Sequence, residues 1–502
     1  LSYRRFCIQV HKRCCVINNA ERKLWGLIPA AGKGTRAFPY TENRHKALLD
    51  VNGAPNIERI IAIMRNDLKI TDIVIVIGHL GESIRQQLGD GSRFNVRLHY
   101  VENKELDKGL AWSIMLARQF ISSYFCIMLC DESYISSNHS ALLDFHWKDA
   151  LFTCAGLKVD DAALIQKNYA VMQQDGVLQQ LIEKPVDVPN DIMGSGTFIC
   201  SPTIFDHLSK SFAATPAYVE FVSLLNVLLA AGERGYFFQL AGTYVNINDR
   251  DSLALARYHD RDLHFSSSRK VLLVYAEGDE EGIVFTIERY RETGVFDEIV
   301  AVLPADSVLA ARVSAAGSAS IICPPGCILY GEKLLYALKQ TSADIIALTE
   351  ADYSFSSRDV QKLFAYLRDA DMVIGTRTTR QLIEQGSTMR GVVRLAHAAL
   401  GKLMELLWWD REARFTDAGC TFRAFWRSTF DIIEPALSAR GPEFSAEMMI
   451  VCLDARLRVI EIPVNYFNRS TSQIRAYRNP QTFWSFLCLI VTRRFQKAGE
   501  NR

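Results

Sequence analysis

A glycine-rich segment with two basic residues is the first candidate for chemistry. Residues 28–53 read IPAAGKGTRAFPYTENRHKALLDVNG, with Gly32 and Gly34 after an apolar run and Arg36 and Lys46 downstream. Glycine lets backbone N–H groups approach an anion closely, and arginine pairs with phosphate oxygens. The spacing matches neither the phosphate loop GxxxxGK[ST] nor the dinucleotide fingerprint GxGxxG. Alone, the segment indicates an anion-binding loop or a tight turn from strand to helix.

Alternating apolar and amphipathic stretches must position these residues. Runs such as DIVIVIG and YFCIMLCD are separated by helical-period segments such as NIERIIAIMRNDL. This alternation predicts an α/β fold built from βαβ units around mainly parallel sheets. It restarts at RKVLLVYAEG after a polar stretch at 259–270, which predicts two tandem domains. The predicted segments are an N-terminal extension (1–23), a first domain (24–260), a linker (261–268), a second domain (269–480) and an amphipathic tail (481–502).

Polar residues follow several apolar runs at the predicted strand ends. In open α/β sheets, ligands bind at the carboxyl ends of the strands. The residues that meet this criterion are 32–36, Asp131, 246–249 and 350–352. These four places are the candidate ligand sites.

The first site resembles the signature of the sugar-phosphate nucleotidyltransferase family. The signature segment is AAGKGTRAFPYTENRHKALLDVNGAPNIERII, and KGLAWSI, CIMLCDE, LIEKP, GSGTFIC and GTYVNINDRDSLALA follow in the family's order. The resemblance spans about residues 24–257. It implies substrate contacts by Ala30, Gly32, Gly34, Thr35, Gly109, Glu183 and Gly196. This chain has His45 where the family usually has proline, Leu110 for threonine, Gly194 for asparagine and Asn246 where many relatives have aspartate.

The resemblance also implies a reaction and its catalytic residues. A sugar-1-phosphate oxygen attacks the α-phosphorus of an NTP and pyrophosphate leaves, so catalysis is mainly positioning and charge neutralisation. Arg36 and Lys46 would hold the triphosphate, and Lys184 would bind the sugar phosphate. Asp131 and Asn246 would bind Mg²⁺, which prefers hard oxygen ligands.

The second domain resembles family 2 glycosyltransferases, a group that includes polyprenol-phosphate sugar transferases. The resemblance covers about residues 269–476 and includes GEKLLYALKQTSADIIALTEADYSFSSRDV, MVIGTR, FTDAGCTFRAF and PEFSAEMMI. It implies that Glu350 and Asp352 hold Mg²⁺, or Mn²⁺, on the diphosphate of an NDP-sugar. The other implied site residues are Glu280, Asp306, Asp417 and Arg469. Pro304 stands where relatives have an aspartate, and Gln473 stands where a lysine is common. Both resemblances imply a Rossmann-like domain of the GT-A type.

Composition restricts the partners. The chain has 57 basic and 56 acidic residues, a net charge of +1, which argues against nucleic-acid binding. Its 12 cysteines lack zinc-site spacing, so buried reduced thiols and a cytoplasmic protein are expected. The run FWSFLCLIV at 483–491 is about half of the roughly 20 residues that a membrane span needs. It predicts either a packed terminal helix or a peripheral segment resting on a membrane surface.

These observations favour a bifunctional enzyme. The first domain would make an NDP-sugar from an NTP and a sugar-1-phosphate, and the second would transfer the sugar to an acceptor such as a lipid phosphate or a glycan. Two alternatives stay open. The first domain could instead be a cytidylyltransferase for a non-sugar alcohol phosphate such as phosphocholine, or both domains could bind nucleotides without turnover in a regulatory protein.

Overall fold

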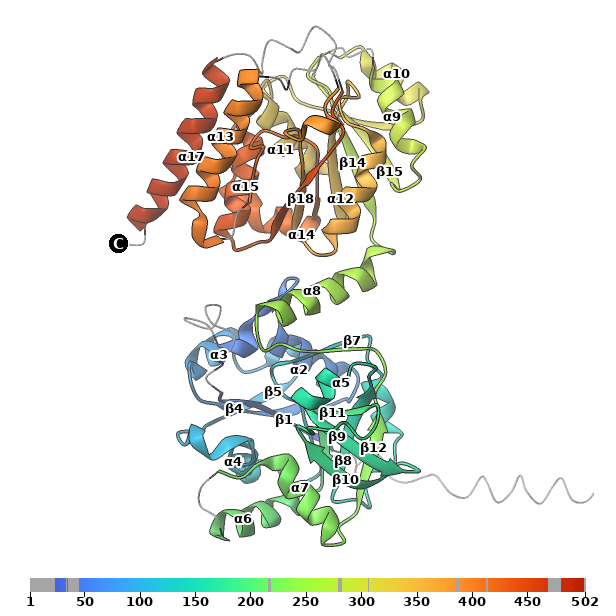
Figure 1. Ribbon diagram of the computed structural model, residues 1–502, viewed down its shortest axis with the longest axis vertical. Coiled ribbons are helices and arrows are strands. Elements are labelled where there is room, and N and C mark those ends of the chain that lie inside the picture. Colours follow the sequence, from blue (N-terminus) through green and yellow to red (C-terminus); the bar gives the residue numbers. More distant parts are fainter. Residues whose placement is uncertain are drawn as a thin grey trace, which may run out of the picture. The chain divides into compact units, whose positions relative to one another are not determined.

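The protein has two compact units, which are described separately (Figure 1). Unit one ends at Asp260 and unit two begins at Arg261. The computed structural model describes residues 23–32, 34, 45–214, 218–278, 282–305, 307–384, 389, 391–411, 414–467 and 480–500. Helix α8 (Arg250–Phe265) contains the division, and it includes the first five residues of the predicted linker 261–268.

Unit one is built around a nine-stranded sheet in the order β5-β4-β1-β6-β11-β8-β12-β10-β9. The strands are β1 (Trp25–Ala30), β4 (Asp72–Ile77), β5 (Arg97–Glu102), β6 (Phe125–Ile127), β8 (Phe152–Lys158), β9 (Tyr169–Gln174), β10 (Val177–Glu183), β11 (Ile192–Cys200) and β12 (Gly235–Gln239). Strands β5, β4, β1 and β6 are parallel. Every residue of β4 is buried, as expected for a parallel strand covered on both faces.

The remainder of this sheet differs from the predicted mainly parallel arrangement. Strand β11 is antiparallel to β6 and β8, and β10 is antiparallel to β9 and β12. Strands β9 and β10 form a hairpin whose turn residues, Asp175 and Gly176, have φ values of 50° and 80°. An Asp-Gly pair favours this two-residue turn, because both positions require positive φ. The prediction of a mainly parallel sheet is therefore wrong for the second half of unit one.

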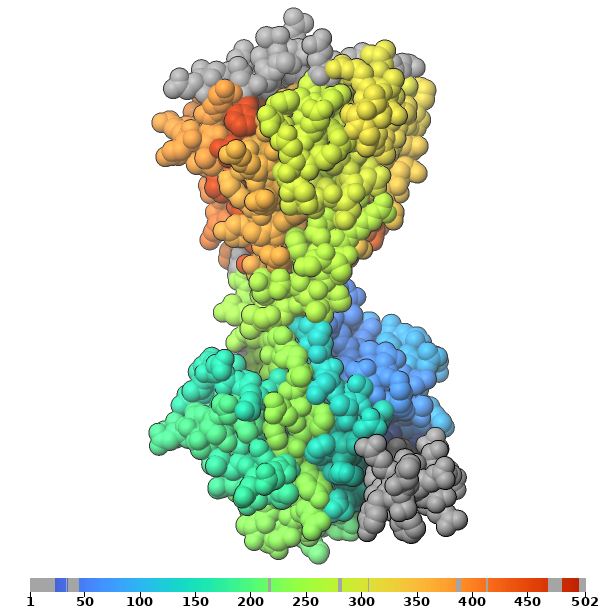
Figure 2. All heavy atoms as spheres, turned by 90° about the vertical axis from the view of Figure 1, so that its right-hand side faces the viewer, coloured from blue at the N-terminus to red at the C-terminus, as the bar shows by residue number. Residues whose placement is uncertain are grey.

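Helices cover both faces of this sheet and form two apolar clusters. The helices are α2 (Asn56–Asn66), α3 (Gly81–Leu88), α4 (Gly109–Leu116), α5 (Ala162–Lys167), α6 (Ile204–Ala214) and α7 (Phe221–Ala230). One cluster includes Ile60 and Met64 of α2, and the other includes Ile114, Leu208 and Leu225 of α4, α6 and α7. Segments distant in sequence share the surface of unit one, where blue residues near 50–100 border cyan and green ones (Figure 2). Two small sheets, β2 (Asp50–Val51) with β3 (Ala54–Pro55) and β7 (Glu132–Ile135) with β13 (Thr243–Asn246), complete the unit.

Unit two contains a seven-stranded sheet in the order β16-β15-β14-β17-β19-β18-β20. Its strands are β14 (Lys270–Tyr275), β15 (Glu298–Leu303), β16 (Ala319–Ile322), β17 (Ile345–Glu350), β18 (Met372–Thr376), β19 (Arg423–Trp426) and β20 (Val459–Pro463). Its helices are α9 (Ile283–Arg291), α10 (Leu309–Ala315), α11 (Tyr330–Gln340), α12 (Val360–Leu367), α13 (Gly391–Leu407), α14 (Arg427–Ile433), α15 (Phe444–Asp454) and α17 (Pro480–Glu500). Strand β19 is antiparallel to both neighbours, and the other pairings are parallel.

The predicted amphipathic tail is a helix packed on unit two. Helix α17 lies beside α13 and α15 (Figure 1). Phe486 and Ile490 are buried in the apolar core of this unit, and Arg493 donates to the buried carboxylate of Glu447. Trp484 and Phe495 remain 59% and 66% exposed. Among the helices that the structure describes, none combines the length and apolar character of a membrane span.

The cysteines within the described ranges are free thiols. Most of them are buried, which agrees with the predicted role of packing residues.

Candidate active site

His45 and Lys46 stand at the start of a short 3₁₀ helix, η3 (Lys46–Leu48). His45 caps this helix, because its Nδ1 accepts the Ala47 N–H at 3.1 Å. Its backbone angles, φ −63° and ψ 143°, are those that proline would adopt, so histidine preserves the backbone expected at this position. Burial lowers the pKa of His45 to about 4. The ring is therefore neutral at pH 7 and adds no charge beside Lys46.

Lys46 joins two segments that follow different strands. Its Nζ donates to Asp131 Oδ2 at 2.8 Å and to Asn248 Oδ1 at 2.7 Å. The side chains of Lys46 and Asp131 are 11% and 27% exposed. Asn248 in turn donates from Nδ2 to Asn246 Oδ1 at 2.8 Å. The structure thus brings three predicted residues, Lys46, Asp131 and Asn246, together around Asn248, which the sequence analysis included in the candidate range 246–249 without assigning it a role.

The small sheet β7–β13 fixes the spacing of this group. Asn246 pairs with Glu132 across the two strands, and the Ile247 N–H donates to the Asp131 carbonyl at 2.7 Å. The Asn248 N–H donates to Ser252 Oγ at 2.9 Å. Both candidate segments are therefore held by backbone hydrogen bonds, which orient the side chains of Asp131 and Asn248 toward Lys46.

The chemistry of these residues fits a magnesium ion. Asp131 supplies a carboxylate and Asn248 an amide oxygen, both of which are hard ligands. Within the described part of the chain, no group of three or more His, Cys, Asp or Glu side chains could hold a metal. An ion here would take its remaining ligands from water and substrate phosphates, as Mg²⁺ commonly does. Asn246 directs its oxygen to the Asn248 amide, so its assignment as a metal ligand stays a prediction and Asn248 has the better placed oxygen.

A buried carboxylate lies directly behind Asp131. Glu132 accepts the Gly196 N–H at 2.9 Å, the Tyr244 hydroxyl at 2.7 Å and the Tyr134 hydroxyl at 2.5 Å. Burial, with a contribution from Asp131, raises the pKa of Glu132 to about 7. This side chain connects β7 to β11, the strand that carries the predicted substrate residue Gly196. The sequence gives no direct signal for it, because two of these partners, Gly196 and Tyr244, are distant in sequence.

Glu183 and Lys184 form a second group in unit one. Glu183 ends β10 and Lys184 follows it, and Lys184 Nζ lies 3.3 Å from Glu183 Oε1 with its side chain 69% exposed. Burial and the charge of Glu220 raise the pKa of Glu183. Glu220 accepts the Tyr218 hydroxyl at 2.6 Å. An exposed lysine beside two acidic groups suits recognition of a phosphate joined to a polyol.

Gly109 lies against the same tyrosine. It begins α4 with φ +80°, and a Cβ atom there would stand 2.5 Å from the Tyr218 ring. Both the backbone conformation and the ring therefore require glycine. Ala30 is the buried end of β1, and Gly32 and Gly34 follow it, whereas Thr35 and Arg36 lie outside the described residues.

The predicted metal ligands of unit two are directed into the protein. Glu350 ends β17, and its Oε1 accepts the Thr421 hydroxyl at 2.6 Å. Asp352 Oδ1 accepts the N–H of Ser354 at 3.0 Å and also its hydroxyl. Burial raises the pKa of Asp352, and the charge of Glu277 adds to this effect. Three other predicted residues, Glu280, Asp306 and Arg469, lie outside the described residues.

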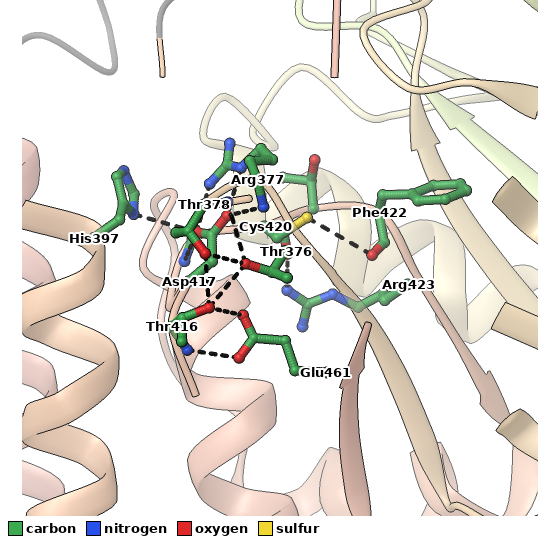
Figure 3. Close-up of polar contacts among 12 residues, drawn as sticks. Thr376, Arg377, Thr378, His397, Thr416, Asp417, Cys420, Phe422, Arg423 and Glu461 are labelled. Atoms are coloured by element: carbon green, nitrogen blue, oxygen red, sulfur yellow. Dashed lines mark hydrogen bonds and ion pairs between the residues drawn. The ribbon is translucent and has the colours of Figure 1, made fainter. Parts of the chain in front are cut away.

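Asp417 forms a fully buried ion pair with Arg377 (Figure 3). It accepts Arg377 Nε and Nη2 at 2.8 Å each, the Arg377 N–H at 3.0 Å and the Gly419 N–H at 3.1 Å. Burial opposes ionisation, but the charge of Arg377 outweighs it and lowers the pKa of Asp417 to about 2. Beside this pair, Glu461 accepts the Thr416 N–H at 2.6 Å and its hydroxyl at 2.9 Å. These contacts give Asp417 a structural role, and its predicted catalytic role stays a prediction.

A match to a family model identifies the class of the first half of the chain. Residues 25–262 match the model of the nucleotidyl transferase family, and this half is a nucleotidyl transferase domain. The match ends at residue 262, so it does not extend to the glycosyltransferase resemblance of unit two.

The first half of the chain is also similar in sequence to curated proteins. The chain is 26% identical over 231 residues to UTP–glucose-1-phosphate uridylyltransferase AglF of Haloferax volcanii, covering 45% of this chain and 93% of the relative. It is 25% identical over 210 residues to the bifunctional protein GlmU of Methanococcus maripaludis, covering 41% of this chain and 47% of that protein. The chain thus spans about half the length of GlmU.

The protein also aligns over about half of its length with solved structures. The inositol-1-phosphate CTP transferase from T. maritima aligns with a TM-score of 0.39 at 20% identity, over 46% of this chain and 91% of that one. A UDP-glucose pyrophosphorylase complexed with UDP-glucose aligns with a TM-score of 0.41 at 21% identity, over 49% and 99% of the two chains.

Proposed function

We propose that unit one transfers a nucleotidyl group from an NTP to a sugar-1-phosphate, forming an NDP-sugar and pyrophosphate. The observation that carries this proposal is the convergence of Lys46, Asp131 and Asn248 at strand ends of a nucleotidyl transferase domain. The names of AglF and of a glucose-1-phosphate thymidylyltransferase from Streptomyces griseus, 25% identical over 217 residues, support glucose-1-phosphate as a first substrate to test.

Different residues of unit one would bind the two substrates. Lys46 would contact phosphate oxygens of the NTP and stabilise charge that builds up on the α-phosphoryl group. Asp131 and Asn248 would hold Mg²⁺, which neutralises phosphate charge. Lys184 would bind the phosphate of the sugar, with Glu183 available for its hydroxyl groups. The attacking phosphate oxygen is already anionic, so the reaction requires no general base on the protein.

For unit two, we propose glycosyl transfer from an NDP-sugar to a lipid phosphate or another glycan precursor. The resemblance of residues 269–476 to family 2 glycosyltransferases supports it. So does the location of residues 350–352 at the carboxyl end of β17. A divalent metal on the donor would bind beside, or in place of, the hydrogen bonds that Glu350 and Asp352 accept from Thr421 and Ser354. The exposed Trp484 and Phe495 would suit peripheral membrane contact on the cytoplasmic side.

Pyrophosphate release tests the function of unit one. The full chain would be supplied with Mg²⁺, each of five NTPs, and either sugar-1-phosphates or phosphocholine. We expect turnover with at least one pair of NTP and sugar-1-phosphate. Turnover with phosphocholine alone would instead assign the domain to the alcohol-phosphate cytidylyltransferases. Nucleotide binding by calorimetry without turnover of any pair would contradict the enzyme proposal and favour a regulatory binding protein.

A substitution in unit two tests the division of activities. Asp352→Ala should abolish transfer of radiolabelled sugar from the NDP-sugar to a polyprenyl phosphate acceptor and should leave pyrophosphate release unchanged. Asp369→Ala, an acidic residue of the same unit without a predicted role, is the matched control and should leave both unchanged. Loss of both activities in the Asp352 variant would contradict the assignment of one reaction to each unit.

A further inference from the structure

The ammonium of Lys46 stands where a divalent ion would stand. Its nitrogen lies 2.8 Å from Asp131 Oδ2 and 2.7 Å from Asn248 Oδ1. Mg²⁺ bound to the same two oxygens would lie roughly 2.0–2.1 Å from each of them. The ion and the ammonium would therefore compete for one space, and their like charges would repel strongly at such a short separation.

This lysine is fixed in place before any ligand binds. Lys46 begins η3, which His45 caps, and the next two residues, Ala47 and Leu48, are buried. The Lys46 side chain is only 11% exposed. The Asn248 amide is oriented by its hydrogen bond to Asn246, so its oxygen is directed toward the ammonium. The contact is thus a preorganised one, unlike a surface ion pair that samples many rotamers.

We infer that Lys46 excludes a free divalent ion from Asp131 and Asn248, so that the metal binds only together with the nucleotide. The inference rests on the proposed function of unit one. A triphosphate offers the ammonium several anionic oxygens in place of one carboxylate. When Lys46 moves to these oxygens, Asp131 and Asn248 become available to the ion that accompanies the phosphates. A free ion brings no such replacement partner for the displaced ammonium.

Titration with Mn²⁺ alone tests this exclusion without any enzymatic turnover. Calorimetry of the full chain should show that Mn²⁺ binds weakly to the unaltered protein and at least tenfold more tightly to Lys46→Met. Methionine has a side chain of similar length to lysine but carries no charge. Asp131→Asn in the Lys46→Met background should abolish the gain. Lys158→Met is the matched control, because its ammonium lies 3.8 Å from Asp191 and both side chains are 59% exposed. It should bind Mn²⁺ as the unaltered protein does.

Equal Mn²⁺ affinity of the unaltered protein and Lys46→Met would overturn the inference. If circular dichroism shows that Lys46→Met is unfolded, Lys46→Gln takes its place. A further measurement uses the unaltered protein with a non-hydrolysable NTP analogue, which should raise its Mn²⁺ affinity at least tenfold above that for Mn²⁺ alone. No increase would also overturn the inference. The two hypotheses can fail separately. If Lys46→Met binds Mn²⁺ tightly but the unaltered protein releases no pyrophosphate, the proposed function is rejected, whereas the exclusion of a free divalent ion by Lys46 is retained.

Discussion

Each unit contains a pair of a basic and an acidic side chain near strand ends, and the two pairs differ in kind. Lys46 meets Asp131 through one hydrogen bond, with 27% of the Asp131 side chain exposed. Arg377 meets Asp417 through two side-chain hydrogen bonds, and neither side chain is more than 1% exposed. A lysine paired with a partly exposed carboxylate can exchange that partner for a ligand, whereas a buried bidentate arginine leaves an uncompensated charge if it moves. The difference indicates a ligand site in unit one and a structural pair in unit two.

The largest expected effect is on catalysis in unit one. Asp131→Ala should lower kcat/KM for pyrophosphate release about a thousandfold, because it removes both the proposed metal ligand and the partner of Lys46. The melting temperature should change little, since the Asp131 side chain is partly exposed. Asp191→Ala, at an exposed position of the same unit, should retain full activity. An active Asp131→Ala enzyme would place the ligand site elsewhere.

The corresponding change in unit two should affect stability instead. Asp417→Asn should lower the free energy of unfolding of unit two by about 3 kcal/mol, because Arg377 stays buried without a full counter-charge. Proteolysis at increasing urea concentrations, with mass-spectrometric identification of the cleaved peptides, would give the free energy of unfolding of each unit separately. Asp262→Asn, which breaks an exposed pair with Arg368, should cost less than about 1 kcal/mol. A stable Asp417→Asn protein without glycosyl transfer would restore a catalytic role for this residue.

A smaller effect is expected on the pH dependence of the free energy of unfolding, through Glu132, which lies behind the Lys46–Asp131 pair. Burial raises the pKa of Glu132 from 4.5 to about 7, so this group binds more protons in the folded unit than in the unfolded chain between these values. Its contribution to the free energy of unfolding should therefore fall as the pH rises from about 4.5 to about 7, by on the order of 2 kcal/mol. Buried His45 and His139, whose pKa values burial lowers to about 4, act in the opposite direction, so the Glu132 contribution is obtained as a difference between two proteins. In urea unfolding of unit one, Glu132→Gln should gain more stability with rising pH than the unaltered protein, whereas Glu82→Gln, whose side chain is 69% exposed, should follow the unaltered protein.

A contribution of the same sign is expected in unit two. Burial raises the pKa of Glu461 to about 7 beside the Arg377–Asp417 pair, and buried His397, whose pKa is lowered to about 4, acts in the opposite direction. Glu132→Gln should leave the pH profile of unit two unchanged, because Glu461 and His397 remain. Identical pH profiles of unit one in Glu132→Gln and the unaltered protein would show that the pKa of Glu132 is not raised on folding.

The smallest expected effect is at His45. His45→Pro should change the free energy of unfolding of unit one by less than about 1.5 kcal/mol, because the backbone already has proline-like angles and the variant loses one capping hydrogen bond. Pyrophosphate release should be largely retained. A large loss of activity with an unchanged melting temperature would give the neutral imidazole a direct role beside Lys46.

Several features of this fold were predictable from local sequence signals. The run DIVIVI predicts a buried parallel strand, and β4 is one. The Asp175-Gly176 pair could have revealed the β9–β10 hairpin, because it favours a turn with positive φ at both positions. The parallel prediction overlooked this signal and therefore missed the antiparallel half of the sheet.

The site was predictable where a residue belongs to the signature segment, as for Lys46, or follows an apolar run, as for Asp131. Asn246 and Asn248 lie two residues apart in one segment, and their side-chain hydrogen bond, which sequence does not show, decides which oxygen meets Lys46. Glu132 and Asp417 depend on partners up to 112 residues distant. Burial and pairing of this kind arise from tertiary packing, which residue type and spacing leave open.

The contact between Arg493 and Glu447 has a consequence for synthesis of the chain. Glu447 is fully buried in α15 and also accepts N–H groups from Ser438 and Ala439. Its only charged partner among the described contacts is Arg493, 46 residues later on α17. We expect the carboxylate to lack this compensating charge during translation until α17 has been made. A chain that terminates before α17 should therefore leave unit two with an uncompensated buried acid and make it more sensitive to proteolysis.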